Sequence, residues 1–228
     1  MSRAPAPAKV NLALVVGPLR DDGKHEVLTV LQRIDLVDRD PLLDSHAPAR
    51  LDAATALRLA NETLPEPLPA DELRSLAAQL GADVPFFLAD GPQLGTGDGS
   101  ELALLDLPQD FWVVVLVPDE AVKTSTADVY AAFDGRKDVV GFAERRRALL
   151  DGLAEVKRPR DLASLPPNDL ASSPLAEELR AAGAFRADVS GAGPALYGLF
   201  HHRREADAAR RALRRLGQVW IAAPAWYG

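Results

Sequence analysis

Residues 7–38 read PAKVNLALVVGPLRDDGKHEVLTVLQRIDLVD, two apolar runs on either side of a polar turn. The first run, residues 10–16, contains several β-branched residues and stops at a Gly-Pro pair, as a buried strand does. The second run, residues 27–36, reads as the returning strand. Asp22-Gly23 lies between them and is typical of tight hairpin turns. The chain is therefore predicted to contain an antiparallel hairpin near its start.

The remaining patterns mix helices and strands without strict alternation, which favours an α+β fold. Asp52 is expected to cap the helix that it begins, and residues 93–100 are expected to form a glycine-rich loop. Periodicity and apolar runs predict helices at residues 52–62, 69–80, 126–133, 141–152, 175–182 and 205–216, and further strands at 111–117, 187–193 (running into a small-residue turn), 195–200 and 219–222.

The composition is that of a globular chain, because 47% of the 228 residues are hydrophobic and 26% are charged. There is no cysteine and the four histidines lack metal-ligand spacing, so no metal site is predicted. The net charge of −7 argues against a nucleic-acid partner. The longest apolar run, residues 111–117, is too short to span a membrane, and residues 1–12 lack the apolar core of a secretory signal. We expect a cytoplasmic protein without a membrane partner.

Four short segments carry residues that chemistry uses. Lys9 and Asn11 lie two apart at the start of a strand, so their side chains point the same way, although the spacing alone favours strand-end solvation. Asp83 lies among glycine, proline and two phenylalanines, which favours partial burial, or it simply caps a helix. Residues 190–194, SGAGP, and residues 95–99, GTGDG, are small-residue turns whose N–H groups can approach an anion.

In their order and wording these segments resemble one family. PAKVNL followed by DDGKHEVLTVLQRIDLVD resembles the N-terminal hairpin of the 4-diphosphocytidyl-2-C-methyl-D-erythritol kinases, which belong to the galactokinase–homoserine kinase–mevalonate kinase (GHMP) superfamily. LGADVPFFLADGPQLGTGDG, residues 80–99, resembles the most specific internal motif of that family. VKTSTADVYAAFD, PPNDL and ADVSGAGPALYGLF also match in order, so the resemblance extends over nearly the whole chain.

The resemblance implies a two-lobed GHMP-kinase-like fold. The N-terminal lobe would be a shortened version of the ribosomal protein S5 domain 2-like lobe, over residues 1–108. The C-terminal lobe would be ferredoxin-like, over residues 109–228. Lys9 and Asp83 should then lie close enough for an ion pair at the interface of the lobes. We expect a monomer or a weak homodimer.

The implied activity is transfer of the γ-phosphoryl group of ATP, with Mg²⁺, to a hydroxyl of 4-diphosphocytidyl-2-C-methyl-D-erythritol, on the non-mevalonate route to isoprenoid precursors. The resemblance makes Asp83 the catalytic carboxylate that accepts the hydroxyl proton. Lys9 would lie beside it, keep it ionised and polarise the hydroxyl. Residues Ser190, Gly191 and Gly193 would border the phosphates of ATP.

The resemblance also assigns residues to the cytidine diphosphate end of the substrate. Asn11, His25 and Thr126 match positions that hold the substrate, with His25 at the cytosine edge, and Tyr130 matches an aromatic residue that stacks on cytosine. Lys24 departs from the pattern, because the family usually has a tyrosine there as the other side of a cytosine sandwich. Since base–aromatic stacking is worth ~1–3 kcal/mol, we expect cytidine nucleotides to bind, but weakly.

A second departure concerns ATP. The family carries a glycine-rich loop, G-L-G-G-G-S-S, that opens the helix after the hairpin and cradles the phosphates. Here SHAPAR, residues 45–50, precedes that helix, no glycine occurs between Lys24 and Gly81, and Pro48 has no N–H to donate. The chain is about fifty residues shorter than the family on a rough length comparison, and the missing piece falls between residues 38 and 52.

These departures leave three interpretations open. The chain is a kinase whose phosphate loop is rebuilt from other residues, or a degenerate homologue that keeps a cytidine-nucleotide or protein-binding role without ATP turnover. The third interpretation is a sequence from which an internal segment is missing. We expect millimolar or no affinity for Mg-ATP, and turnover far below the about 1–100 s⁻¹ of kinases.

Overall fold

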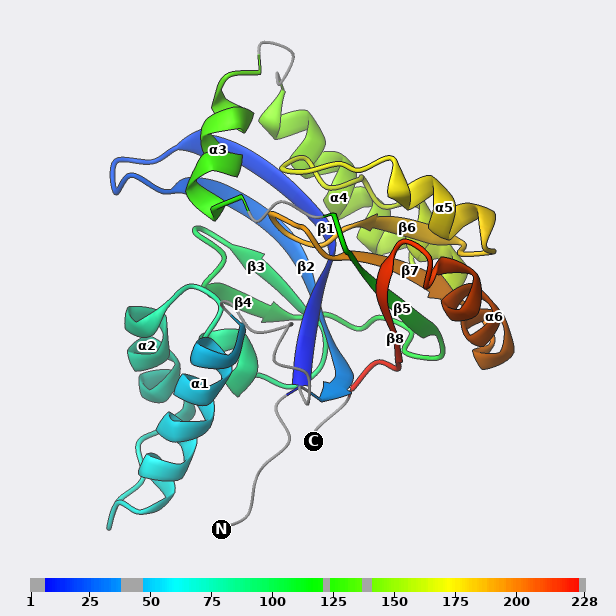
Figure 1. Ribbon diagram of the computed structural model, residues 1–228. Helices are drawn as coiled ribbons and strands as arrows, with labels where there is room; N and C mark the ends of the chain where they lie inside the picture. Colours follow the sequence, from blue (N-terminus) through cyan, green and yellow to red (C-terminus); the bar gives the residue numbers. More distant parts are fainter. Residues whose placement is uncertain (1–6, 38–46, 121–123, 137–140, 226–228) are drawn as a thin grey trace.

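Two four-stranded antiparallel sheets form the frame of the molecule, in the order β1-β2-β3-β4 and β6-β7-β5-β8 (Figure 1). The computed structural model describes residues 7–37, 47–120, 124–136 and 141–225. Helices pack around both sheets, so the α+β prediction is confirmed. No helix in these ranges is long and apolar enough to cross a membrane.

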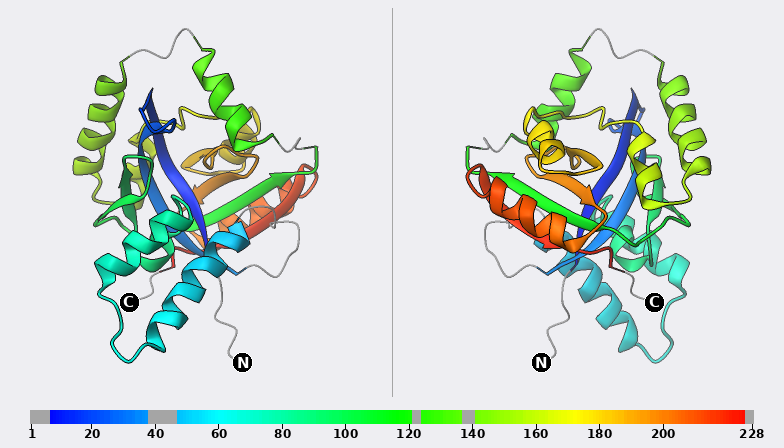
Figure 2. Two further views of the ribbon diagram at one scale, coloured as in Figure 1. Left: turned by 90° about the vertical axis from the view of Figure 1, so that its left-hand side faces the viewer. Right: turned by 90° about the vertical axis from the view of Figure 1, so that its right-hand side faces the viewer.

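The predicted hairpin is present and longer than expected. It consists of β1 (Pro7–Leu19) and β2 (His25–Val37), paired from the turn to the far end. Gly23 adopts a φ of 77° in the turn, a conformation that glycine takes at little cost. Figure 2 shows the turn end of this hairpin between two helices, α3 (Thr126–Asp134) and α4 (Phe142–Glu155).

The prediction of a loop over residues 93–100 is wrong. Residues Gln93–Thr96 form strand β3, and Glu101–Leu104 form strand β4, so only the residues between them are a turn. Gly95 lies opposite Thr29, and a Cβ on it would come within 3.0 Å of the Thr29 methyl group. The glycine therefore permits close strand packing rather than marking a loop.

Three helical segments pack beside the first sheet: α1 (Ala47–Glu62), α2 (Ala70–Leu80) and the short 3₁₀ segment η1 (Pro85–Leu88). Helix α1 begins at Ala47, so the prediction that Asp52 caps it is wrong. Pro48 lies in the first turn, where a missing N–H is tolerated. The segment expected to replace the phosphate loop thus contributes its last residues to a helix, and residues 44–46 of it lie outside the described ranges.

The second sheet carries the C-terminal half of the chain, and its strands pair antiparallel. Helices α5 (Leu175–Ala181) and α6 (Arg203–Leu213) cover one face of this sheet, and Figure 2 shows α6 lying on it. The elements of this half, beyond α3 and α4, are β5 (Trp112–Pro118), η2 (Pro159–Ser164), α5 (Leu175–Ala181), β6 (Arg186–Val189), β7 (Leu196–Phe200), α6 (Arg203–Leu213) and β8 (Gly217–Ala222).

One hydrophobic core joins the two sheets. Val10 and Leu12 of the hairpin pack in the same cluster as Val113 of β5, Leu149 of α4 and Leu199 of β7, and all five are almost fully buried. Because this core crosses from one sheet to the other, the two halves meet over an apolar interface. The boundary at residues 108 and 109 stays a prediction.

Candidate functional site

Lys9 and Asp83 meet where β1 passes the segment between α2 and η1. The Lys9 ammonium lies 3.3 Å from Asp83 Oδ1, and both side chains are about three-quarters buried. The ion pair expected between them is therefore present. A fixed cation beside a partly buried carboxylate is an arrangement that can bind and deprotonate a hydroxyl group.

Asn11 connects this pair to the glycine turn. Its Oδ1 accepts a hydrogen bond from Lys9 Nζ at 3.2 Å, and its Nδ2 donates to Thr29 Oγ1 at 2.9 Å. Its backbone N–H donates to Ser190 Oγ at 3.1 Å. Asn11 is 5% exposed, so these bonds fix the orientation of its amide.

The SGAGP turn is built on two glycines with positive φ angles. Gly191 and Gly193 have φ angles of 58° and 78°, the Ser190 N–H donates to the Ala195 carbonyl, and the Gly193 N–H donates to the Ser190 carbonyl. Among the described residues, the N–H groups of Gly191 and Ala192 donate to no carbonyl. Two open N–H groups beside Ser190 fit an anionic oxygen, although they are fewer than a complete phosphate loop supplies.

His25 and Tyr130 stack on each other at the turn end of the hairpin, with ring centroids 5.0 Å apart. His25 Nδ1 lies 2.8 Å from the Gly17 carbonyl and Nε2 lies 3.2 Å from Asp134 Oδ1. Both ring nitrogens therefore have partners within the protein, and the role of His25 at a cytosine edge stays a prediction. Burial raises the pKa of the Tyr130 hydroxyl, and the carboxylate of Asp83 raises it further.

Thr126 lies in the first turn of α3 and is exposed. Ser125 precedes it and caps the helix by accepting the N–H of Asp128 at 3.1 Å. Tyr130 follows Thr126 by one helical turn, so both side chains occupy the same face of α3. Of the predicted substrate residues, Asn11 lies on β1 beside Lys9, whereas His25, Thr126 and Tyr130 lie together around the turn of the hairpin.

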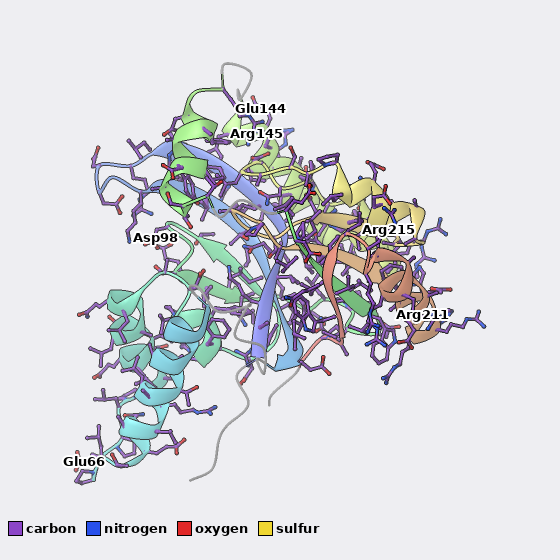
Figure 3. The ribbon with its side chains drawn as sticks, in the orientation of Figure 1. Glu66, Asp98, Glu144, Arg145, Arg211 and Arg215 are labelled. Atoms are coloured by element: carbon purple, nitrogen blue, oxygen red, sulfur yellow. The ribbon has the colours of Figure 1, made fainter. Side chains whose placement is uncertain are left out.

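Lys24, the position where the family pattern has tyrosine, is tied to the turn between β3 and β4. Its ammonium forms an ion pair and hydrogen bond with the carboxylate of Asp98, which also accepts Ser100 N–H at 3.2 Å and Ser100 Oγ–H at 2.6 Å. Figure 3 labels Asp98 at this turn. The GTGDG segment thus binds a lysine of this chain through its aspartate.

Sequence reasoning missed a group of buried polar residues behind the site. Asn168 of the PPNDL motif bonds to the Gly191 carbonyl at 2.7 Å, and Arg186 donates to the Leu12 carbonyl at 2.6 Å. The motif was visible, but nothing local indicated its partners. Within the described ranges, no three histidine, aspartate or glutamate side chains gather into a metal-binding group.

A family model, related sequences and solved structures all match this chain, and they agree on its family. Residues 167–219 match the family described as GHMP kinases C terminal. A 4-diphosphocytidyl-2-C-methyl-D-erythritol kinase from Desulfitobacterium hafniense is 30% identical over 270 residues, covering 94% of this chain and 92% of the relative. The chain belongs to the 4-diphosphocytidyl-2-C-methyl-D-erythritol kinase family. The relative from Geobacter sulfurreducens is also 30% identical and covers 96% of both chains.

Structural comparison agrees with this membership. The crystal structure of a 4-(cytidine 5'-diphospho)-2C-methyl-D-erythritol kinase superposes with a TM-score of 0.75, at 27% identity and 99% coverage of both chains. The Methanococcus jannaschii mevalonate kinase, 12% identical, shares the GHMP kinase fold with a TM-score of 0.60. The alignment with the Desulfitobacterium family member is longer than the 228 residues of this chain, so it contains gaps on this chain's side. Such gaps are expected if a segment present in the family is missing here.

Proposed function

We propose that this family member is a small-molecule kinase that phosphorylates a hydroxyl of 4-diphosphocytidyl-2-C-methyl-D-erythritol, with ATP as the phosphoryl donor, on the non-mevalonate route to isoprenoid precursors. The observation that carries the proposal is the Lys9–Asp83 ion pair at 3.3 Å, held by Asn11 at the edge of the glycine turn. Relatives that cover more than nine-tenths of the chain bear the name of this kinase, which supports the choice of substrate.

In the proposed reaction, Asp83 accepts the proton of the substrate hydroxyl as its oxygen attacks the γ-phosphorus. Lys9 stabilises the negative charge that develops on that oxygen and keeps Asp83 ionised. Mg-ATP, when bound, supplies the phosphoryl group and leaves as ADP after the bond from the γ-phosphorus to the bridging oxygen breaks. Gly191 and Ala192 would donate their N–H groups to phosphate oxygens. Positioning and charge neutralisation are what phosphoryl transfer requires from a protein.

The cytidine end of the substrate is assigned to the turn end of the hairpin. Tyr130 offers an aromatic face there, and Thr126 offers a hydroxyl on the same side of α3. His25 reaches a bound base through Nε2 only when Asp134 moves aside, because Asp134 Oδ1 lies 3.2 Å from that nitrogen. We therefore expect a titration with CDP to show weak binding that exceeds the binding of ADP. Equal binding of both nucleotides would contradict a retained cytidine pocket.

A degenerate homologue without ATP turnover is the second candidate. It is favoured by residues 38–52, which contain no glycine and include Pro48 in the first turn of α1. Close wrapping of a phosphate needs positive φ angles and free N–H groups, which this segment lacks at Pro48. Such a protein would keep a cytidine-nucleotide or protein-binding role and bind Mg-ATP with millimolar affinity or not at all.

One assay separates the two candidates. The purified chain is incubated with Mg-ATP and 4-diphosphocytidyl-2-C-methyl-D-erythritol, and phosphorylated product is measured for the natural chain and for Asp83→Asn. Product that disappears in Asp83→Asn supports the kinase with a rebuilt phosphate site. CDP binding without product, in a chain that is folded by circular dichroism, supports the degenerate homologue and overturns the kinase proposal.

A further inference from the structure

Asn168, in the PPNDL motif, is a buried residue that the proposed reaction does not use. It is 7% exposed, and every hydrogen-bonding position of its side chain has a partner. Nδ2 donates to the carbonyls of Val189 at 3.0 Å and Gly191 at 2.7 Å. Oδ1 accepts the N–H of Leu170 at 2.8 Å and that of Ala171 at 3.4 Å. Because all of its hydrogen bonds are made, the buried amide has one orientation and fixes the backbone groups that are bonded to it.

The two carbonyls that Asn168 holds lie on either side of Ser190. The amide group therefore fixes the backbone before and after this serine, and with it the position of the hydroxyl. Ser190 Oγ accepts the backbone N–H of Asn11 at 3.1 Å and lies 3.5 Å from Asn11 Oδ1. The contact leaves little room, because a Cβ added to Gly191 would lie 3.3 Å from the same Oδ1 atom. A shift of the turn is thus passed directly to Asn11.

We propose that Asn168 is a positioning residue for the phosphoryl-transfer site. Its amide holds Ser190 against Asn11, and Asn11 Oδ1 in turn holds the Lys9 ammonium at 3.2 Å, beside Asp83. Hydrogen bonds and one ion pair connect Asn168 to the proposed proton acceptor without a gap. In its kinetic consequence the inference rests on the proposed function, whereas its structural content does not.

The test removes the Asn168 Nδ2 donor and keeps the size and shape of the side chain. Asn168→Asp retains an oxygen that accepts the Leu170 N–H, but puts an oxygen in place of Nδ2 against the two carbonyls. Asp169→Asn is the matched control, because Asp169 lies in the same motif and binds Arg145 and Val16 instead of the glycine turn. Both variants are expected to lower the melting temperature, which measures their common structural cost.

Only Asn168→Asp is expected to affect the chemistry. Its kcat should fall by between about tenfold and about a hundredfold, the cost of a displacement of about 1 Å at a reacting group, while KM for the cytidine substrate stays within about twofold. Asp169→Asn should keep kcat within about twofold. An equal fall of kcat in both variants would overturn the inference, because it would reflect lost stability alone.

A second readout is independent of turnover. The backbone amide signal of Asn11 in nuclear magnetic resonance spectra reports its hydrogen bond to Ser190 Oγ. The chemical shift of this signal should change in Asn168→Asp and stay the same in Asp169→Asn. This expectation holds whether or not the chain has kinase activity. If the signal is unchanged in Asn168→Asp, the positioning role is wrong even where the kinase assay succeeds. If it moves in a chain without turnover, the positioning role stands and the proposed function fails.

Discussion

At the scale of single residues, Lys24 is the position that separates this chain from the family pattern. Its ammonium is bound by Asp98, so its charge is already balanced and its chain is directed to the turn between β3 and β4. A tyrosine at this position would offer a ring to a base, whereas this lysine fastens one turn to another. In this chain the side chain at position 24 therefore makes a contact within the protein.

The Lys24–Asp98 contact predicts a pH dependence of stability. Burial raises the pKa of the Asp98 carboxyl, but hydrogen bonds from Lys24 and Ser100 outweigh this effect and lower the pKa to about 2. Because this value lies below that of the unfolded chain, the stabilisation is complete at neutral pH and is lost as the pH falls from about 4 to about 2. The contact contributes about 1 kcal/mol or less, since Lys24 is largely exposed.

Urea unfolding between pH 2 and pH 7 measures this effect. The free energy of unfolding of the natural chain should exceed that of Asp98→Asn above about pH 4, and the difference should shrink below it. Lys24→Met should remove only part of this pH dependence, because the two hydrogen bonds from Ser100 to Asp98 remain. A difference between the natural chain and Asp98→Asn that is constant over the whole range would contradict the assignment.

Tyr130 carries the other residue-scale prediction. Its ring stacks on His25 and supplies an aromatic face at the proposed cytidine site. Tyr130→Ala removes that face, so CDP affinity should fall by about tenfold or more, the equivalent of ~1–3 kcal/mol of lost stacking. Tyr130→Phe keeps the ring and should bind CDP nearly as the natural chain does. Isothermal titration calorimetry measures both, and equal affinities of Tyr130→Ala and Tyr130→Phe would show that the ring does not contact the base.

At the scale of elements, the pair of helices α1 and α2 rests on a small core. Ala54 of α1, Ala77 of α2 and Val84 beside Asp83 are its buried centre. Small side chains bury little apolar area, so this pair gains less from packing than the strands do. Figure 1 shows the pair projecting from the sheet, and Figure 3 labels Glu66 near its tip. Asp83 lies beside this small core, in the segment between α2 and η1.

Ala77→Asp should separate this helix pair from the sheet. The change places a carboxylate in an apolar cluster, and burial of such a charge costs several kcal/mol. Amide hydrogen exchange should become fast in α1 and α2, while protection persists in β5 and β7. Gln79→Asp, at an exposed position of α2, should leave exchange unchanged. Equal loss of protection in α2 and β5 would mean that the helix pair unfolds only with the whole molecule.

The elements that the sequence predicted well are those whose signal is local. Asp22-Gly23 and its flanking apolar runs define the hairpin within their own residues. Strand β3 was mistaken for a loop because Gly95 owes its place to a neighbour on another strand. The start of α1 was placed too late because Asp52 was taken as its cap, whereas the helix begins at Ala47 and accepts Pro48 in its first turn. A contact between distant segments explains the first error, whereas the second comes from a local signal.

The site was predictable to a smaller extent. The Lys9–Asp83 pair was expected from the family resemblance, since no periodicity relates residues so far apart in the chain. Asn168 gave no comparable signal: its PPNDL motif was noticed, but its partners Val189 and Gly191 belong to a different segment. Polar residues that act through buried hydrogen bonds become visible only when the fold brings these segments together.

At the scale of the whole molecule, Arg186 fastens the second sheet to the hairpin. Its guanidinium lies 3.8 Å from Asp188 and donates at 2.6 Å to the carbonyl of Leu12, which also accepts the hydroxyl of Tyr197 at 2.8 Å. The same guanidinium also donates to the carbonyls of Leu162, Leu165 and Pro166. The side chain is almost completely buried, so all of these groups depend on it.

Arg186→Met should destabilise both halves together. The change leaves the buried Asp188 carboxylate without the guanidinium beside it, and several carbonyls without donors, at a cost of about 3–5 kcal/mol. Urea unfolding followed by hydrogen exchange should show β1 and β7 losing protection in one transition, at lower urea than in the natural chain. Arg158→Met, at an exposed ion pair, should hardly change the midpoint. Two separate transitions in Arg186→Met would show that the halves are independent.

The way in which β1 is bonded also has a consequence for synthesis on the ribosome. One edge of β1 pairs with β2, which follows at once, but its other edge is completed by Asp169, Arg186 and Ser190. Strand β1 is translated well before these three residues, so its second edge stays incomplete until they emerge. Until they arrive, the nascent chain carries an incomplete strand edge, which is prone to pair with other chains. Ribosome-bound chains stalled before residue 165 should consequently depend on chaperones, and chains released at that point should aggregate.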